Sequence, residues 1–245
     1  MAYESAIAYD AVHAARGKDY TAEAGQITAL IRAAVPRAAS LLDLACGSGG
    51  HLAHFQRDFA DVVGLDASQV MLDAAAIRAP SAQLVLGDLA DFDLGRRFDA
   101  IVCLFSSLGY LRDTGRLRSA AASIARHLNR EGIVLVEPWL TAEQFGTGRI
   151  SVDTGQSAHR TVARITRSSV VDGRAVLAMD YLVAEADVTE HITERHEMTL
   201  FAHADYLEGM RTAGLDAQLD GDAGPAGRGL ITARSAGLRR GLHTS

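Results

Sequence analysis

The sequence has few cysteines and no long apolar run. Its two cysteines, Cys46 and Cys103, are too few for a disulfide framework, and their spacing fits no metal-binding motif. No segment is long and apolar enough to span a bilayer. Acidic Glu4 and Asp10 precede the first apolar stretch, so the N-terminus does not resemble a signal peptide. We therefore expect a cytoplasmic protein with no membrane partner and no metal.

Basic residues are also in deficit. The chain has 24 Lys and Arg against 30 Asp and Glu, a formal net charge of −6. Proteins that coat DNA or RNA neutralise phosphates with clustered basic side chains, so we expect no nucleic-acid partner. The 245 residues are 48% hydrophobic, which is enough for one well-shielded domain with or without an insertion.

From about residue 40 to residue 138, short apolar runs alternate with helical patterns. This alternation predicts a doubly wound α/β fold, in which a parallel sheet is connected by helices. The expected strands are 41–44, 62–65, 83–86, 100–104 and 133–136. The expected helices are 21–35, 50–58, 68–79 and 115–129.

The pattern changes after Pro138. Residues 149–200 show apolar residues with a period of two, and Asp172-Gly173 between two such runs (161–171 and 174–184) is a strong hairpin signal. We expect a small antiparallel sheet inserted into the core, followed by a helix and a last strand that complete it (203–213 and 229–233). The expected organisation is therefore a core (1–139), an insertion (140–200) and a C-terminal completion of the core (201–245).

Acidic residues and glycines follow successive predicted strands. The first strand carries Asp43 and runs into the glycine-rich turn 45–50; Asp66 ends the second strand, and Asp88 follows the third. Ligands of parallel sheets bind outside the carboxyl ends of the strands. Each acid alone could be a loop residue or a helix cap, but three successive strand ends together predict a nucleoside site, with Asp66 on the ribose and Asp88 on the adenine amine.

The sequence of the glycine-rich turn helps to distinguish a dinucleotide cofactor from a sulfonium cofactor. A dinucleotide site favours G-x-G-x-x-G, but Leu52 stands at the third glycine position after Gly47 and Gly49. A sulfonium cofactor has no phosphates to hold, and the Gly87–Leu89 segment suits an adenosyl group. We therefore expect an S-adenosylmethionine (SAM)-dependent methyltransferase rather than a dehydrogenase.

Segments 42–49, 64–72 and 87–89 resemble class I methyltransferases. A closer and more specific resemblance is to the N,N-dimethyltransferases of nucleotide-linked amino sugars in antibiotic biosynthesis. It covers almost the whole chain and is carried by the segments 16–20, 105–110, 136–139, 160–164 and 227–230.

The resemblance implies a set of SAM-binding residues. It places Arg16 near the methionine carboxylate, Asp66 on the ribose, Leu89 beside adenine and Leu104 close to the sulfonium. The complete expected set is Arg16, Tyr20, Asp43, Ala45, Gly47, Asp66, Met71, Asp88, Leu89 and Leu104.

The resemblance also implies a pocket for a TDP-linked amino sugar, and it leaves a homodimer open. Arginine suits a diphosphate because its planar fork donates several hydrogen bonds and stays charged. His13 stands where we expect tyrosine in the macrolide-sugar members, which leaves the sugar and the 3- or 4-amino position open. The expected substrate residues are His13, Glu137, Trp139, Ser151, Arg160, Arg164 and Arg228.

Methyl transfer needs a neutral amine, and His127, His13 and Tyr110 are candidates to position or deprotonate it. His127 could instead pack locally within its helix. Two other functions remain: methylation of another small amine or hydroxyl, or nucleoside binding without turnover. Convergence of Arg160, Arg164 and Arg228 on one pocket would argue against the first, and an open passage between the two pockets would argue against the second.

Overall fold

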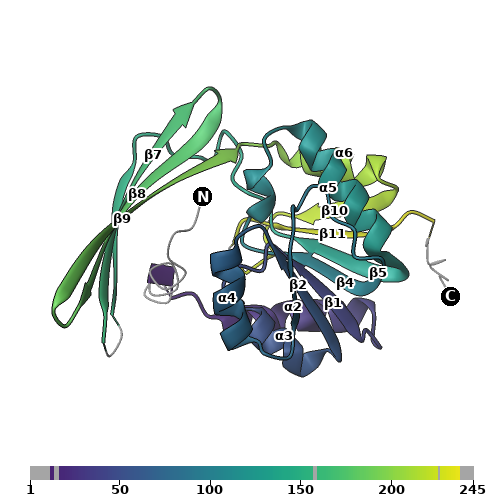
Figure 1. Ribbon diagram of the computed structural model, residues 1–245. Helices are drawn as coiled ribbons and strands as arrows, with labels where there is room; N and C mark the ends of the chain where they lie inside the picture. Colours follow the sequence, from purple (N-terminus) through teal and green to yellow (C-terminus); the bar gives the residue numbers. More distant parts are fainter. Residues whose placement is uncertain (1–11, 14–16, 157–158, 226, 238–245) are drawn as a thin grey trace.

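The computed structural model describes residues 12–13, 17–156, 159–225 and 227–237 (Figure 1). A seven-stranded sheet has the order β10-β11-β5-β4-β1-β2-β3. Strands β1 to β5 pair in parallel, and β11 pairs antiparallel with both β5 and β10. This sheet confirms the predicted α/β fold, and its strands are β1 (Ser40–Leu44), β2 (Asp61–Asp66), β3 (Gln83–Leu86), β4 (Phe98–Cys103), β5 (Leu128–Val136), β10 (Leu215–Asp220) and β11 (Leu230–Ser235).

Helices cover both faces of this sheet (Figure 1). One face packs against α2 (Tyr20–Ala34), α3 (Leu52–Asp58) and α4 (Gln69–Arg78). The other face packs against α5 (Thr114–His127) and α6 (His203–Thr212). Burial on both faces explains why the central strands are apolar almost throughout.

Side-chain caps fix where several helices begin. Asp19 accepts the Ala22 N–H at α2, Ser68 accepts the Met71 N–H at α4, and Asp113 accepts the Arg116 N–H at α5. The predicted helices lie within two residues of these elements. The strands differ in two places. Strand β5 begins at Leu128 rather than at residue 133, because Leu128 already pairs with Phe98 of β4, and strand β10 was not predicted at all.

A second sheet of four antiparallel strands stands beside the core (Figure 1). We call it the insertion sheet. Its strands are β6 (Ile150–Gln156), β7 (Thr161–Val171), β8 (Arg174–Glu185) and β9 (Val188–Thr199). Asp172 and Gly173 have φ values of 49° and 74°, as a two-residue hairpin turn requires, so the predicted hairpin is confirmed.

The insertion sheet turns one face toward the core. Alternate residues on β7 and β8, such as Arg164, Thr166, Met179 and Tyr181, line the same cavity, as the period of two requires. Within the described ranges, no helix has both the length and the apolar character needed to cross a membrane.

Candidate active site

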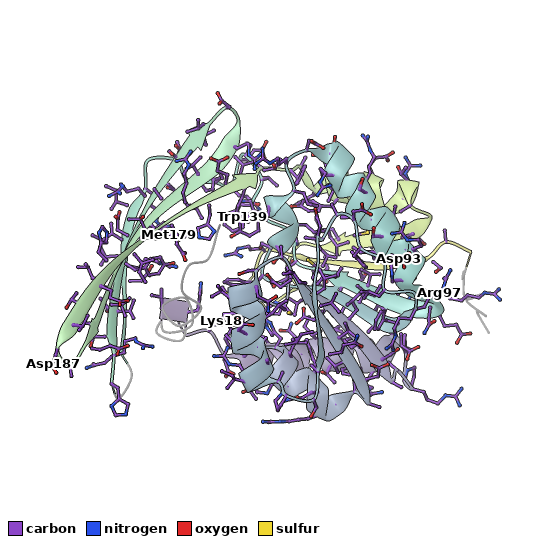
Figure 2. All side chains as sticks on the ribbon, viewed as in Figure 1. Lys18, Asp93, Arg97, Trp139, Met179 and Asp187 are labelled. Atoms are coloured by element: carbon purple, nitrogen blue, oxygen red, sulfur yellow. The ribbon has the colours of Figure 1, made fainter. Side chains whose placement is uncertain are left out.

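A cavity of about 700 Å³ lies between the carboxyl ends of the parallel strands and the inner face of the insertion sheet. In Figure 2, Lys18 and Trp139 border this space from the core side and Met179 from the insertion sheet. The strand order reverses direction between β1 and β4, which is where ligands of open α/β sheets bind. The predicted site residues that line the cavity are His13, Tyr20, Asp43, Ala45, Gly47, Asp66, Met71, Leu89, Leu104, Tyr110, Trp139, Ser151, Arg164 and Arg228.

The turn after β1 brings bare backbone to the cavity. Ala45, Gly47 and Gly49 all have positive φ, a conformation that is rare for Ala45 because it carries a Cβ. Asp66, at the end of β2, holds this turn: Oδ2 accepts the Gly47 N–H and Oδ1 accepts the Ser68 N–H, both at 2.9 Å. Burial raises the pKa of Asp66. Its carboxylate is thus fixed in place at the edge of the cavity, where ribose hydroxyls could donate to it.

Asp43 lines the same end of the cavity and is almost fully buried. Its Oδ2 atom has no hydrogen-bond partner within the described chain. Burial, and then the charge of Asp66, raise the pKa of Asp43 to about 8. A cationic donor such as the ammonium of SAM would supply both the missing hydrogen bond and the missing positive charge, so this end of the cavity fits the cofactor.

The loop after β4 lines the middle of the chain of strand ends that borders the cavity, and it contributes Phe105 and Ser107 to the lining. Phe105 and Ser106 have φ values of 55° and 68°, the left-handed region that non-glycine residues rarely adopt. Buried Glu137 accepts the Phe105 N–H at 2.8 Å, and Ser106 donates to the Pro138 carbonyl at 2.8 Å. Glu137 does not line the cavity, which corrects the predicted contact with substrate: its carboxylate supports the loop instead.

Arg228 reaches into the cavity from the segment before β11. Its guanidinium lies over the rings of Phe105 and Trp139, with centroid distances of 5.6 and 5.0 Å, and Nη1 donates to Ser106 Oγ at 2.9 Å. Stacking on two aromatic rings leaves the guanidinium edge directed toward polar groups. Arg228 is therefore a fixed positive charge in the lining of the cavity.

The insertion sheet and the segment after β5 contribute a second set of polar groups. Arg164 is buried, and its Nη2 donates to Asp153 Oδ2 at 2.8 Å. Trp139 Nε1 and Thr166 Oγ1 are buried without a hydrogen-bond partner in the part of the chain that the structure describes, and both residues line the cavity. Buried polar atoms are costly when they are unsatisfied, so these groups are suited to contact a polar ligand.

Two predicted ligand contacts need correction. The Asp88 side chain is 54% exposed, forms an ion pair with Arg116 and does not line the cavity, although its neighbour Leu89 does. Arg160 pairs with Glu185 at the far end of the insertion sheet, beyond the cavity. The three predicted arginines therefore do not converge: Arg164 and Arg228 line the cavity and Arg160 does not.

His127 is also misplaced for catalysis. It is buried in α5 outside the cavity, where Nε2 accepts the Leu94 N–H at 2.9 Å and Nδ1 donates to the Ser123 carbonyl at 2.7 Å. Its ring packs against Phe92. This placement corrects the predicted proton-transfer role to a structural one. Arg16, predicted to bind the methionine carboxylate, lies outside the described residues.

Sequence reasoning missed many residues of the cavity, among them Lys18 and His196. Lys18 Nζ lies 3.9 Å from the Phe105 ring centroid and contacts Glu23 Oε2 at 2.6 Å; it stands in the resembling segment 16–20, which could have indicated it. His196, on β9, lies 2.7 Å from Tyr110. No local sequence signal indicates His196, because the contact joins residues 86 positions apart.

Comparisons with known proteins agree with this geometry. Residues 41–132 match the model of a methyltransferase domain. A dTDP-3-amino-3,4,6-trideoxy-alpha-D-glucopyranose N,N-dimethyltransferase from Streptomyces venezuelae is 46% identical, over 91% of this chain and 94% of the relative. A dTDP-4-amino-2,3,4,6-tetradeoxy-D-glucose N,N-dimethyltransferase from Saccharopolyspora spinosa is 38% identical, over 91% and 89%.

One of the similar solved structures contains bound SAM. The SAM-bound structure of an amino pentose methyltransferase from Micromonospora echinaspora, involved in calicheamicin biosynthesis, has a TM-score of 0.83 and 35% identity, and the match covers 92% of this chain and 95% of the other. Identity at this level over nearly the whole of each protein shows the family. The chain belongs to the SAM-dependent N,N-dimethyltransferases of nucleotide-linked amino sugars.

Proposed function

We propose that this enzyme transfers two methyl groups in succession from SAM to the 3- or 4-amino group of a dTDP-linked deoxy sugar. The observation that carries the proposal is the single cavity of about 700 Å³, which joins the strand-tip residues of the core to Arg164, Arg228 and the polar inner face of the insertion sheet. A methyl donor and a charged sugar nucleotide could therefore meet inside one enclosure.

In this proposal the core binds the cofactor. Asp66 takes the ribose hydroxyls, Asp43 takes the ammonium, and Leu89 and Met71 pack beside the base. When bound, SAM supplies an electrophilic methyl group on a sulfonium. The protein's part is to align the attacking amine with that methyl group, and alignment of this kind can contribute about 7–11 kcal/mol to lowering the barrier.

The substrate nucleotide is assigned to the opposite end. Arg228 would hold the diphosphate, because its guanidinium is fixed by Phe105 and Trp139 and carries a permanent charge. Arg164 is already paired with Asp153, so it contributes less net charge there. Relatives that act on 3-amino and on 4-amino sugars match the chain over similar lengths, which is why the proposal keeps both positions.

Methylation of another small amine or hydroxyl is the alternative substrate assignment. It would need no fixed positive charge at the substrate end, and Arg228 argues against it. A nucleoside-binding protein without turnover would have a closed wall between the two ends of the cavity. The cofactor and substrate ends instead belong to one continuous space.

The test is mass spectrometry of dTDP-3-amino and dTDP-4-amino deoxy sugars incubated with the enzyme and SAM. We expect products heavier by one and then by two methyl groups, with a preference for one ring position. SAM binding without any mass gain on either series would reject the proposed substrate. A mass gain on small amines that lack the nucleotide, at comparable kcat/KM, would favour the alternative.

A further inference from the structure

Three polar side chains form a chain that leads from the cavity into the insertion sheet. Tyr110 lies in the short helix η1 (Ser107–Tyr110) after β4, while His196 and Glu194 lie two residues apart on β9. Tyr110 Oη is 2.7 Å from His196 Nδ1, and His196 Nε2 is 3.1 Å from Glu194 Oε2. Tyr110 and His196 line the cavity, and His196 and Glu194 are buried, with 3% and 6% exposed surface.

These contacts fix where the protons lie. An ionised Glu194 can only accept, so His196 Nε2 carries a hydrogen and donates it. In the neutral imidazole, Nδ1 is then an acceptor, and Tyr110 must donate its hydroxyl proton to it. The Tyr110 oxygen, having donated its proton, can only accept from any further polar partner. It therefore suits a donor in the cavity, such as an ammonium group.

Other charged and titratable groups lie on the strands beside His196. On β8, burial and then the charge of Glu194 raise the pKa of Tyr181 to about 12, so Tyr181 stays neutral. On β7, Arg164 stays charged and is paired with Asp153 of β6. The charged and titratable residues that line the cavity from elsewhere are His13, Lys18, Tyr20, Asp43, Cys46, His51, Asp66, Arg149 and Arg228.

We propose that Tyr110, His196 and Glu194 form a relay that removes the proton from the substrate ammonium. This inference rests on the proposed function. The ammonium N–H bond breaks and its proton passes to Tyr110 Oη, while the phenol proton moves to His196 Nδ1. The products are a neutral amine with a free electron pair and an imidazolium beside the Glu194 carboxylate. Tyr110 is the catalytic residue, and His196 and Glu194 are positioning residues that act through it.

Dimethylation would use this relay more than once. The first transfer leaves a methylated ammonium, which must lose a proton before its nitrogen can attack again. His196 passes its proton to solvent between transfers. A defect in the relay therefore slows the second methylation as well as the first, and N-monomethyl product accumulates.

The experiment compares Tyr110→Phe, His196→Asn and Glu194→Gln with a matched control, His191→Asn. His191 lies on the same strand, but its side chain is 56% exposed and pairs with Asp180 outside the cavity. General acid–base groups contribute about 10²–10⁴-fold, so we expect Tyr110→Phe to lower kcat/KM about 10²-fold at neutral pH. The loss should shrink toward pH 9, where more of the free substrate amine is already neutral. The monomethyl fraction should rise, while SAM affinity and the melting temperature stay near those of His191→Asn.

The relay would be overturned by a loss of kcat/KM that is equal at every pH, because a packing defect does not depend on the charge of the amine. An unchanged ratio of monomethyl to dimethyl product would overturn it too. If His196→Asn does not fold, Tyr110→Phe decides, since it removes one oxygen atom. An inactive wild type on every amino sugar would reject the proposed function itself, whereas an active wild type with flat variant profiles rejects the relay alone.

Discussion

The guanidinium of Arg228 stacks over the indole ring of Trp139, with its central carbon 5.0 Å from the ring centroid. Trp139 lies in the segment after the end of β5, and Arg228 lies in the segment before the start of β11, so the contact depends on the antiparallel pairing of these two strands. The same guanidinium donates to Ser106 in the strained loop after β4. The tips of three strands thus hold one positive charge in place.

Removal of that charge should weaken nucleotide binding. We expect Arg228→Gln to raise the KM for the dTDP-sugar about 10–100-fold, the effect of losing hydrogen bonds worth about 1.5–3 kcal/mol to a charged group. The value of kcat should change much less, because the reacting amine lies elsewhere. Steady-state kinetics with saturating SAM measures both.

Arg160→Gln is the matched control, because Arg160 forms its ion pair with Glu185 beyond the cavity. Its KM should stay within about twofold of the wild type, as for most surface changes. A rise in KM as large as that of Arg228→Gln would mean that Arg160 does reach the nucleotide.

Binding of SAM should release a proton from Asp43. Its pKa of about 8 keeps this carboxyl protonated at pH 6–7, and a bound ammonium favours the ionised form. Affinity should therefore increase with pH between about 6 and 7, by up to about tenfold per unit. Calorimetry in buffers of different ionisation enthalpy measures the released proton, and Asp43→Asn should abolish its release.

The same carboxyl should affect the ligand-free enzyme. The folded protein keeps the Asp43 proton to a higher pH than the unfolded chain does. Its contribution to stability is therefore complete below about pH 4 and is lost progressively as the pH rises to about 8. Asp43→Asn should gain stability relative to the wild type over that range, and a constant difference in melting temperature would contradict this.

Asp66 and Asp88 should differ in their importance for SAM. Asp66 lines the cavity and holds the turn through Gly47, so Asp66→Asn should weaken SAM binding about 10–100-fold. Asp88→Asn mainly disturbs the exposed pair with Arg116, and we expect less than about a threefold change. Equal losses in calorimetric titrations would show that Asp88 turns to contact adenine in the complex.

His127 should matter for stability and not for turnover. His127→Ala leaves the Leu94 N–H and the Ser123 carbonyl without their partner, which costs about 1–3 kcal/mol besides the lost packing on Phe92. Chemical denaturation should show this loss, and kcat/KM per folded molecule should remain near wild type. A collapse of kcat with unchanged SAM affinity would restore a catalytic role.

Local patterns predicted the core well, because each parallel strand and crossover helix carries its own periodicity and turn chemistry. The Asp172-Gly173 hairpin and the Ser68 cap are signals of this kind, and both are present. The homodimer and the cytoplasmic location stay predictions.

The partner that a side chain contacts depends on how far along its strand the residue lies. Local sequence patterns predict the strand but not the partner. Arg160 and Arg164 have the same parity and share a motif, but four residues of extended chain separate them by about 13 Å. That distance places Arg160 beside Glu185 and Arg164 beside Asp153. Likewise, the Tyr110–His196 contact depends on how the insertion sheet docks on η1, which no window of sequence encodes.

The division of the cavity between two sheets has an evolutionary consequence. In the proposed arrangement the methyl donor is held largely by backbone and acids of the parallel core, whereas the wall opposite consists of alternating side chains on the insertion sheet. Substitutions at those alternate positions can alter which sugar is accepted without disturbing the donor site. Enzymes of this kind can therefore diversify their acceptors while the chemistry of transfer is inherited unchanged.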